Sequence, residues 1–249
     1  MVAYPHRLGP EADIAPVAAL MADATRAAML TALLDDRPLA AGELARLAGV
    51  SPATASAHLA RLMKGGLITG TSQGRHRYYR LNGHDVATAL EALGHISPPM
   101  PVRSLRASRQ EAALAAARTC YDHLAGRAGV ALLDALRARR VVTPEDQRPA
   151  GLDVTEEGEG TLASFGVNVK VLRKSRRRLA GECLDWTERR YHLNGAVGAA
   201  ITARLLDLGW IERGARRRAV RVTPEGERGL ATTFGWSDGA TTGSTVRGA

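Results

Sequence analysis

Two helix-forming segments near the start of the chain are separated by only three residues, and this restricts how they can pack. The first segment, 41–48, ends at Gly49, and the second begins at Ser51-Pro52, where serine can cap a helix and proline fits its first turn. In the second segment the helical period places three apolar residues on one face: Ala55, Leu59 and Leu62. The pattern predicts two helices joined by a tight turn, the second of them held against a core by its apolar face.

The flanking sequence predicts further helices and a hairpin. Helices are expected at 16–22 and 24–34, with Asp23 as the cap of the second. After Gly65-Gly66, the segments 67–69 and 77–81 are expected to be strands joined by a polar turn at 70–74. One more helix is expected at 86–93, and the prolines of the linker 97–103 cannot continue it.

A family resemblance follows from the residues of this region. Two stretches carry it: Leu44-Ala-x-x-Ala48-Gly-Val50-Ser51-x-x-Thr54-x-Ser56-x-His58-Leu59-x-x-Leu62-x-x-x-Gly66-Leu67-Ile68, and Gly74-Arg-x-x-Tyr78-Tyr79-x-Leu81. Together they resemble the ArsR-type winged helix-turn-helix repressors. Ala22-Asp23-Ala24-Thr25-Arg26 is similar to that family's helix start, with Ala24 where proline is usual. Over residues 14–96 the resemblance implies a homodimer on a palindromic operator of double-stranded DNA, and repression that an effector relieves.

The resemblance and the helix pattern together give a set of DNA-contacting residues. The outward face of the helix from Pro52 is small near its start and basic near its end, which suits insertion into a major groove. The predicted contacts are Ser51, Thr54, Ser56, His58, Arg61 and Lys64 on the helix and Arg75, His76 and Arg77 in the wing. The alternative is a solvated amphipathic helix beside an ordinary hairpin.

Composition bounds the function classes. The net charge of +9 favours a polyanionic partner, whereas the 4% aromatic content disfavours RNA recognition by base stacking. No apolar stretch is long enough to span a membrane, and with two cysteines and no apolar signal segment we expect a cytoplasmic protein. The sequence contains none of the common catalytic motifs, so we expect no enzyme; a non-specific nucleic-acid-binding protein remains an alternative.

An internal repeat organises the second half of the chain, with copies at 120–166 and 189–235. His123-Leu-Ala-Gly-x-x-Gly129 matches His192-Leu-Asn-Gly-x-x-Gly198, and Val154-Thr-Glu-Glu-Gly matches Val222-Thr-Pro-Glu-Gly. Each copy is expected to be helix, hairpin, helix, and together they form a two-lobed effector or accessory domain at 104–236. Alternatively, Val-Thr-x-Glu-Gly is only a good strand exit and helix start. The arm 1–13 and the tail 237–249 are expected to be disordered.

The overall expectation is a mainly α protein with small β-hairpin wings: a winged helix-turn-helix domain, then a helical two-lobed domain whose repeats could be degenerate winged-helix units.

Two kinds of effector are open for the second domain. Cys120 and His123, expected on one helical face, could bind zinc or sense thiol oxidation together with Cys183 and His192. A small organic effector between the lobes could instead contact the scarce aromatics Tyr121, Trp186, Tyr191 and Trp210. For both sets the alternative is core packing. The basic runs 173–178 and 216–218 either extend the DNA footprint or are a solvated surface.

Overall fold

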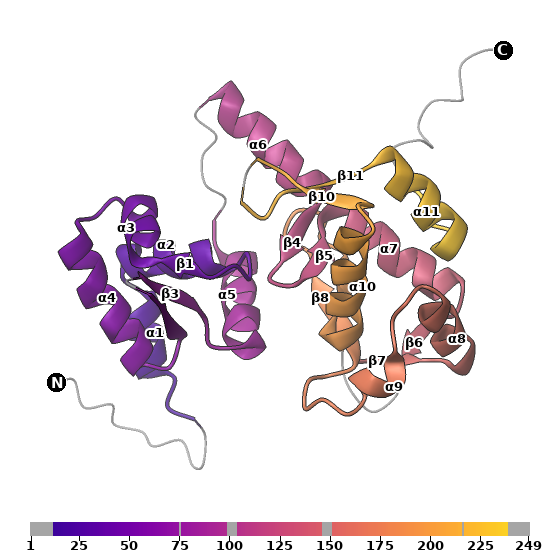
Figure 1. Ribbon diagram of the computed structural model, residues 1–249, viewed down its shortest axis with the longest axis horizontal. Coiled ribbons are helices and arrows are strands. Elements are labelled where there is room, and N and C mark those ends of the chain that lie inside the picture. Colours follow the sequence, from indigo (N-terminus) through magenta and orange to yellow (C-terminus); the bar gives the residue numbers. More distant parts are fainter. Residues whose placement is uncertain (1–11, 75, 99–103, 146–150, 216, 239–249) are drawn as a thin grey trace. The chain divides into compact units, whose positions relative to one another are not determined.

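The computed structural model describes residues 12–74, 76–98, 104–145, 151–215 and 217–238. The chain divides into two compact units, Met1–Leu90 and Glu91–Ala249 (Figure 1). The division falls within a helix, a few residues before the linker expected at 97–103. Most of that linker, of the arm at 1–13 and of the tail at 237–249 lies outside the described residues.

The first unit is a winged helix-turn-helix, as the sequence predicts. Its elements are α1 (Ala15–Met21), α2 (Ala24–Leu33), β1 (Leu39–Ala40), α3 (Ala41–Ala48), α4 (Pro52–Lys64), β2 (Ile68–Gln73), β3 (His76–Leu81) and the start of α5 (His84–Ile96). The strands form one antiparallel sheet in the order β1-β3-β2. The sheet and the buried faces of α2, α3 and α4 enclose a core that includes Met29, Leu44 and Leu59.

The helix ends in this unit are set by the residues that the sequence indicated. Asp23 caps α2 by accepting a hydrogen bond from the Arg26 backbone N–H at 2.9 Å. Gly49 ends α3 in the left-handed conformation with φ 67°, and Ser51 caps α4 by accepting from the Thr54 N–H. Arg26 is buried and donates to the carbonyls of Leu20 and Ala19, which fixes the end of α1 against α2.

The wing differs from the expectation. The segment 70–74 was predicted to be a turn, but β2 continues to Gln73, where it pairs with His76. The hairpin is therefore longer than predicted and its turn is shorter. The strand β1 was also missed, because two residues are too few to give an alternating pattern.

The second unit contains two copies of one series of elements, after α6 (Leu105–Ala116). The first copy is β4 (Arg118–Cys120), β5 (His123–Ala125), α7 (Gly126–Ala138), β6 (Val142–Pro144), β7 (Gly151–Val154) and α8 (Glu156–Ser164). After α9 (Val169–Leu172), the second is β8 (Ala180–Leu184), β9 (Tyr191–Asn194), α10 (Gly195–Asp207), β10 (Ile211–Arg213), β11 (Val220–Val222) and α11 (Pro224–Phe234). The expected helix, hairpin, helix series is thus present twice, and each copy begins with an additional hairpin, β4-β5 or β8-β9.

The two repeats exchange strands, so they form one body. The hairpin β6-β7 of the first repeat joins β8-β9 of the second in a sheet of order β6-β7-β8-β9. Reciprocally, the start of β11 runs beside β4, where Val220 N–H donates to the Ala117 carbonyl and Thr119 N–H to the Arg218 carbonyl. One continuous core draws apolar residues from both repeats, among them Leu133 and Leu205.

Two glycines permit the central hairpins to approach the helices. A Cβ on Gly129 in α7 would lie 2.4 Å from the Leu124 carbonyl oxygen and 3.5 Å from the Cβ of His192. A Cβ on Gly198 in α10 would lie 2.7 Å from the Leu193 carbonyl oxygen and 3.4 Å from the Cβ of His123. Each helix therefore packs closely on the histidine of the other repeat.

No helix among the described residues is long and apolar enough to cross a membrane.

Candidate DNA interface and candidate metal centre

The exposed face of α4 carries most of the predicted DNA contacts. Its apolar stripe, Ala55, Leu59 and Leu62, is fully buried, so the opposite face is directed to solvent. Arg61 and Lys64 are exposed there, and in the described part of the chain neither forms an ion pair. These two cations are available for a phosphate backbone.

The hydroxyl groups at the start of α4 are exposed but already engaged within the helix. Ser51 Oγ lies 2.9 Å from Thr54 Oγ1 and accepts from the Thr54 N–H, and Ser56 Oγ donates to the Pro52 carbonyl at 2.9 Å. They can still accept hydrogen bonds from a nucleic acid, since each hydroxyl oxygen has two lone pairs.

His58 is placed differently from the expectation. Its side chain is only 15% exposed, and Nδ1 lies 3.6 Å from Oδ1 of Asp23, the cap of α2. His58 therefore contacts α2 and orients α4, instead of joining the exposed face. A residue on the flank of a helical wheel can face either way, and the sequence pattern does not decide which.

The wing, which follows α4 in the sequence, supplies further basic residues. His76 and Arg77 are exposed on β3, and the Arg77 guanidinium lies 5.7 Å from the centre of the Tyr79 ring. Arg75, also predicted to contact DNA, lies outside the described residues. Arg80 was not among the predicted contacts, and it is also exposed on β3, between the buried Tyr79 and Leu81. A charged residue between two apolar ones was the available signal in the sequence.

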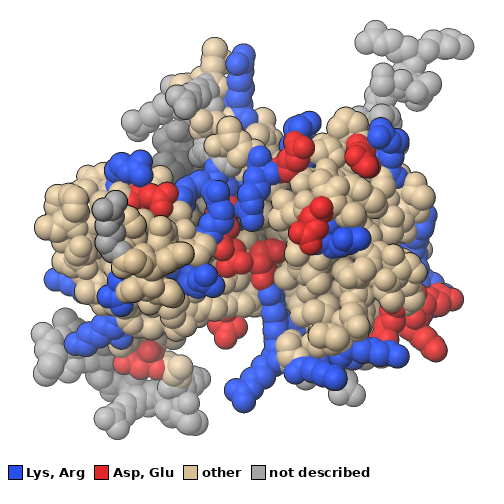
Figure 2. All heavy atoms as spheres, viewed as in Figure 1, with Lys and Arg blue, Asp and Glu red and all other residues tan. Residues whose placement is uncertain are grey.

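The basic runs of the second unit are partly neutralised. Arg173 pairs with Glu159 at 2.9 Å, and Arg177 pairs with Asp122. On the face drawn in Figure 2, Lys and Arg are spread among acidic and uncharged residues and do not form one continuous patch. Part of this charge therefore stabilises the second unit, and Arg216 lies outside the described residues.

The second unit brings together two cysteines and two histidines, which we call the Cys-His cluster: Cys120, His123, Cys183 and His192. One ligand atom from each residue lies within 4.8 Å of all the others. The two sulfurs are 3.9 Å apart, and the two imidazole rings are stacked with centres 5.1 Å apart. Three of the four residues are almost fully buried, with Cys120 and His123 2% exposed and His192 0%.

The cluster is built from hairpins, which corrects the prediction that Cys120 and His123 share a helical face. Cys120 at the end of β4 pairs across the strands with His123 at the start of β5. Cys183 of β8 pairs in the same way with His192 of β9. A two-residue turn gives the same spacing as one helical turn, so the sequence did not separate the two structures; Tyr121 makes the turn possible with φ 58°.

Each histidine has a carboxylate beside its Nδ1 atom. The distance from His123 Nδ1 to Asp122 Oδ1 is 3.2 Å, and that from His192 Nδ1 to Asp185 Oδ2 is 3.4 Å. These contacts direct the Nε2 side of each ring away from the carboxylate. For His192, both ring nitrogens are buried and neither has a hydrogen-bond partner among the described residues, so its contact with Asp185 is an ion-pair distance and not a hydrogen bond. The sequence reading missed both aspartates, although Asp122 is adjacent to His123.

Both carboxylates are held in the charged form. Burial opposes the charge on Asp185, but Arg118, Thr187 and the Gly126 N–H outweigh it and hold the pKa well below its usual range. Burial likewise opposes the charge on Asp122, and hydrogen bonds from His123 and Arg177 lower its pKa.

Within the Cys-His cluster, the pKa of His123 and of Cys120 is raised, whereas that of His192 is lowered. Burial disfavours a charged His123, but the Cys120 sulfur and Asp122 outweigh it and raise its pKa to about 9. Burial and the neighbouring His123 lower the pKa of His192, so the stacked rings do not both carry a proton charge. The hydrogen bond with Cys183 and burial raise the pKa of the Cys120 thiol.

The aromatics proposed as an organic-effector site occupy separate environments. Trp210 packs against Phe165 and the common core, with ring centres 5.5 Å apart. The Trp186 ring lies 4.5 Å from the Arg118 guanidinium, whereas Tyr191 is 45% exposed. Trp210 also lines a cavity of about 550 Å³ together with Arg139 and Arg204. The four aromatics, Tyr121 included, therefore do not line one common site.

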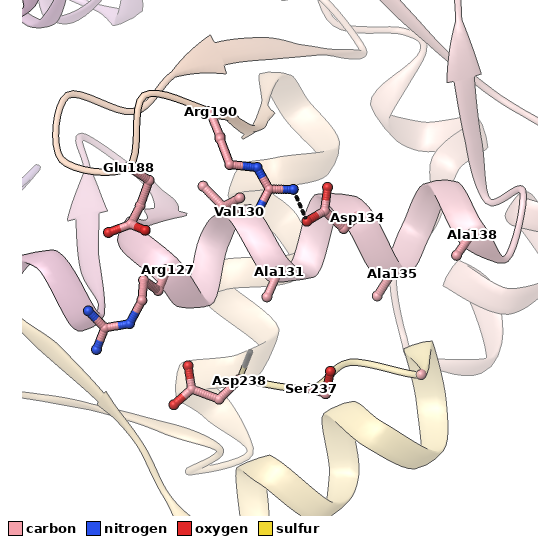
Figure 3. Close-up of a pocket in the computed structure, with 11 residues that line it drawn as sticks. Arg127, Val130, Ala131, Asp134, Ala135, Ala138, Glu188, Arg190, Ser237 and Asp238 are labelled. Carbon is pink, nitrogen blue, oxygen red and sulfur yellow. Dashed lines mark hydrogen bonds and ion pairs between the residues drawn. The ribbon is translucent and has the colours of Figure 1, made fainter. Parts of the chain in front are cut away.

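A cavity of about 490 Å³ lies along α7, as Figure 3 shows. Its floor consists of small side chains, Ala131, Ala135 and Ala138, and charged groups surround it, including an Arg190–Asp134 ion pair of 2.7 Å. None of the four proposed aromatics lines it.

Comparison with known proteins identifies relatives of the chain. A model of a helix-turn-helix domain matches residues 21–71. The chain is 42% identical over 215 residues to YdfF of Bacillus subtilis (strain 168), an uncharacterized HTH-type transcriptional regulator, and the match covers 86% of this chain and 94% of YdfF.

Two solved structures are similar over about a third of the chain. A homodimeric winged helix-turn-helix DNA-binding domain, Mb0332 of Mycobacterium bovis, is 29% identical and covers 35% of this chain and 87% of that one, with a TM-score of 0.30. The cadmium sensor CMTR of Mycobacterium tuberculosis is 30% identical and covers 37% and 99%, with a TM-score of 0.28.

Proposed function

Because this chain belongs to the HTH-type transcriptional regulators, we propose that it is a sequence-specific repressor that binds a palindromic operator as a homodimer. The observation that carries the proposal is the exposed face of α4, small at its start and basic at its end, opposite a fully buried apolar stripe. A helix of about 10–12 Å diameter fits a major groove about 12 Å wide. The ArsR-type resemblance of residues 14–96 favours repression over activation.

The contacts divide into two kinds. Thr54 and Ser56 are short enough to let α4 enter the groove and to reach base edges, whereas Arg61 and Lys64 at its other end reach phosphates. The wing residues His76, Arg77 and Arg80 suit an adjacent phosphate or minor groove. Phosphate contacts position the protein, and the base contacts determine which sequence it binds.

Exposed apolar residues on the first and last helices of the DNA-binding region support a homodimer. No residue of α1 is buried, and Ile14 and Val17 are 76% and 38% exposed. On α5, Leu93 is 42% and Ile96 is 81% exposed. A second copy of the chain would cover such residues, and a two-fold axis would set two α4 helices about one helical turn of DNA apart.

The test is binding of the full chain to duplexes selected from a random pool, measured at several salt concentrations. We expect one palindromic sequence to be enriched. Arg61→Ala should weaken binding to it and reduce the slope of log affinity against log salt by about 1.8, the effect of two lost phosphate contacts, one from each protomer.

The matched control is Arg228→Ala, which removes one positive charge from an exposed position on α11. It should leave both affinity and slope nearly unchanged. Equal losses in the two variants would mean that net charge alone drives binding, and a pool without an enriched palindrome would contradict sequence-specific binding.

A further inference from the structure

We propose that Cys120, His123, Cys183 and His192 bind one Zn²⁺ ion in a closed tetrahedral site that joins the two repeats of the second unit. This proposal does not depend on the DNA-binding function, because it concerns other residues and is tested without DNA.

The donor set and its geometry fit zinc. Two thiolates and two imidazoles are a common structural zinc shell, and the S₂N₂ donor set favours Zn²⁺ over oxygen-preferring cations such as Mg²⁺ or Ca²⁺. Two sulfurs bound to zinc at about 2.3 Å in a tetrahedron lie about 3.8 Å apart. The observed separation of 3.9 Å nearly equals this value and is about twice the length of a disulfide bond.

The remaining donors need only a small adjustment. Ligand atoms separated by at most 4.8 Å must approach by about 1 Å to reach the edge length of the tetrahedron. Side-chain rotation alone can supply such a change, because each cysteine already stands opposite its histidine in a paired hairpin.

The carboxylates behind the histidines support the same conclusion. Histidine ligands of zinc generally donate the other ring N–H to a carboxylate, which fixes the tautomer and orients the ring. Asp122 and Asp185 stand at Nδ1 of His123 and His192, respectively. For His123 this arrangement leaves Nε2 for the metal. Both ring nitrogens of His192 are buried without a hydrogen-bond partner among the described residues, although Nδ1 lies 3.4 Å from Asp185. A bound metal would give one of these nitrogens its partner, and a small rotation of the ring would let the other donate to Asp185.

Asp185 is itself held by a network that fixes its position. It accepts from Arg118 Nη2 at 2.9 Å, from the Gly126 N–H at 2.7 Å, and from the backbone and hydroxyl of Thr187. Arg118 and Gly126 belong to the first repeat, whereas Asp185 and His192 belong to the second. The hydrogen bonds that hold Asp185 therefore join the two repeats, as the four proposed ligands do.

A closed site implies a structural or sensing role rather than a catalytic one. All four positions of the tetrahedron are protein ligands, so no position is left for water or substrate. Burial of three ligands also limits the access of oxidants to the thiols.

The experiment uses the full chain, purified reduced and without a histidine tag, stripped with a chelator and titrated with Co²⁺. We expect one Co²⁺ per chain, with the visible absorption of a tetrahedral site and a thiolate charge-transfer band in the near ultraviolet, and displacement of Co²⁺ by Zn²⁺. Cys120→Ser and Cys183→Ser should each lose much of the charge-transfer band. His76→Gln, an exposed histidine of the wing, is the matched control and should give the wild-type spectrum.

Two further measurements keep the test decisive if the cysteine variants do not fold. In the wild-type chain, Zn²⁺ should slow the reaction of both thiols with a thiol reagent, and the chelator should restore the faster reaction. Asp185→Asn does not remove a metal ligand, but it weakens the support of His192 and the network with Arg118. It should lower Zn²⁺ affinity about 10–100-fold while two thiolates still bind.

Three results would overturn the proposal: no charge-transfer band in the wild type, a full band in Cys120→Ser, or conversion of the two thiols to a disulfide without metal uptake. The last would make the cluster a thiol switch instead.

Discussion

Replacing Arg118 with methionine tests whether the two repeats are held together by the buried network behind the Cys-His cluster. Arg118 is 1% exposed and pairs with Asp185, which is fully buried. Its Nη1 also donates to Thr187 Oγ1 and to the Leu114 carbonyl, and its guanidinium stacks on Trp186. Methionine retains the apolar length of the side chain but removes the charge and these donors.

The expected cost lies near the lower end of the range for breaking a buried pair, which is about 3–5 kcal/mol. Without Arg118, the Asp185 carboxylate still accepts hydrogen bonds from Gly126, Thr187 and the Glu188 N–H. Arg118 Nε also lacks a hydrogen-bond partner in the described chain, so the native pair is itself imperfect. We therefore expect a loss of about 3 kcal/mol, or about 150-fold in the unfolding equilibrium.

Tryptophan fluorescence can follow this loss in the full chain. All three tryptophans of the sequence, Trp186, Trp210 and Trp236, lie in the second unit. Urea unfolding monitored by this signal reports the second unit separately, even if the first unit unfolds at another concentration. For a unit of about 150 residues, the same loss should lower the melting temperature by about 6–12 °C.

Arg190→Met is the matched control, because Arg190 forms an ion pair with Asp134 in the same unit but is 61% exposed. An exposed pair contributes about 0–1 kcal/mol, so this variant should be nearly as stable as the wild type. Equal stability of the two variants, or a loss below about 1 kcal/mol for Arg118→Met, would refute the reasoning that the buried network holds the repeats.

Three further substitutions test the packing and the assembly. Thr223→Ala should lower the free energy of unfolding by about 1–2 kcal/mol, because Thr223 caps α11 by accepting from the Gly226 N–H. The control Thr232→Ala, at an exposed position on the same helix, should change the free energy of unfolding by less than about 0.5 kcal/mol. Gly129→Ala should destabilise the second unit in urea unfolding, because the added Cβ would lie 2.4 Å from the Leu124 carbonyl oxygen. At Gly160 the added Cβ meets open space, so the control Gly160→Ala should be neutral or stabilising. The reverse order of stability would contradict the close packing of α7. Ile14→Glu should convert the dimer to a monomer in light scattering after size-exclusion chromatography, and an unchanged mass would remove α1 from the interface.

The helices of the first unit could be predicted closely, because residues next to each helix end determine where the helix begins or stops. Gly49 adopts the left-handed conformation and Ser51 caps the next helix, and both signals lie within the residues that they affect. The prediction of the wing was less accurate, because the residues at the tip of the hairpin are exposed on both faces. The segment 70–73 therefore has no apolar alternation, although it pairs with β3.

The Cys-His cluster shows the limit of local signals. The chemistry of the four residues and the internal repeat predicted that they belong together, but Cys120 and His123 were expected on a helix. Cys120 and Cys183 are 63 residues apart and meet only because the repeats pack with their central hairpins together. The left-handed Tyr121, which makes the first hairpin, is not a glycine and gave no signal.

The repeat also explains why the proposed site needs both copies. At the repeat offset of 69 residues, His123 and His192 are equivalent, but the residue equivalent to Cys120 is Arg189. The first hairpin closes through two residues, one of which is Asp122, whereas the second closes through 185–190, where Asp185 and Trp186 lie. Each repeat thus provides one cysteine and one histidine, which are two of the four ligands, and one carboxylate that supports its histidine. An isolated repeat cannot form a closed site, so bound zinc would directly report that the two repeats have assembled.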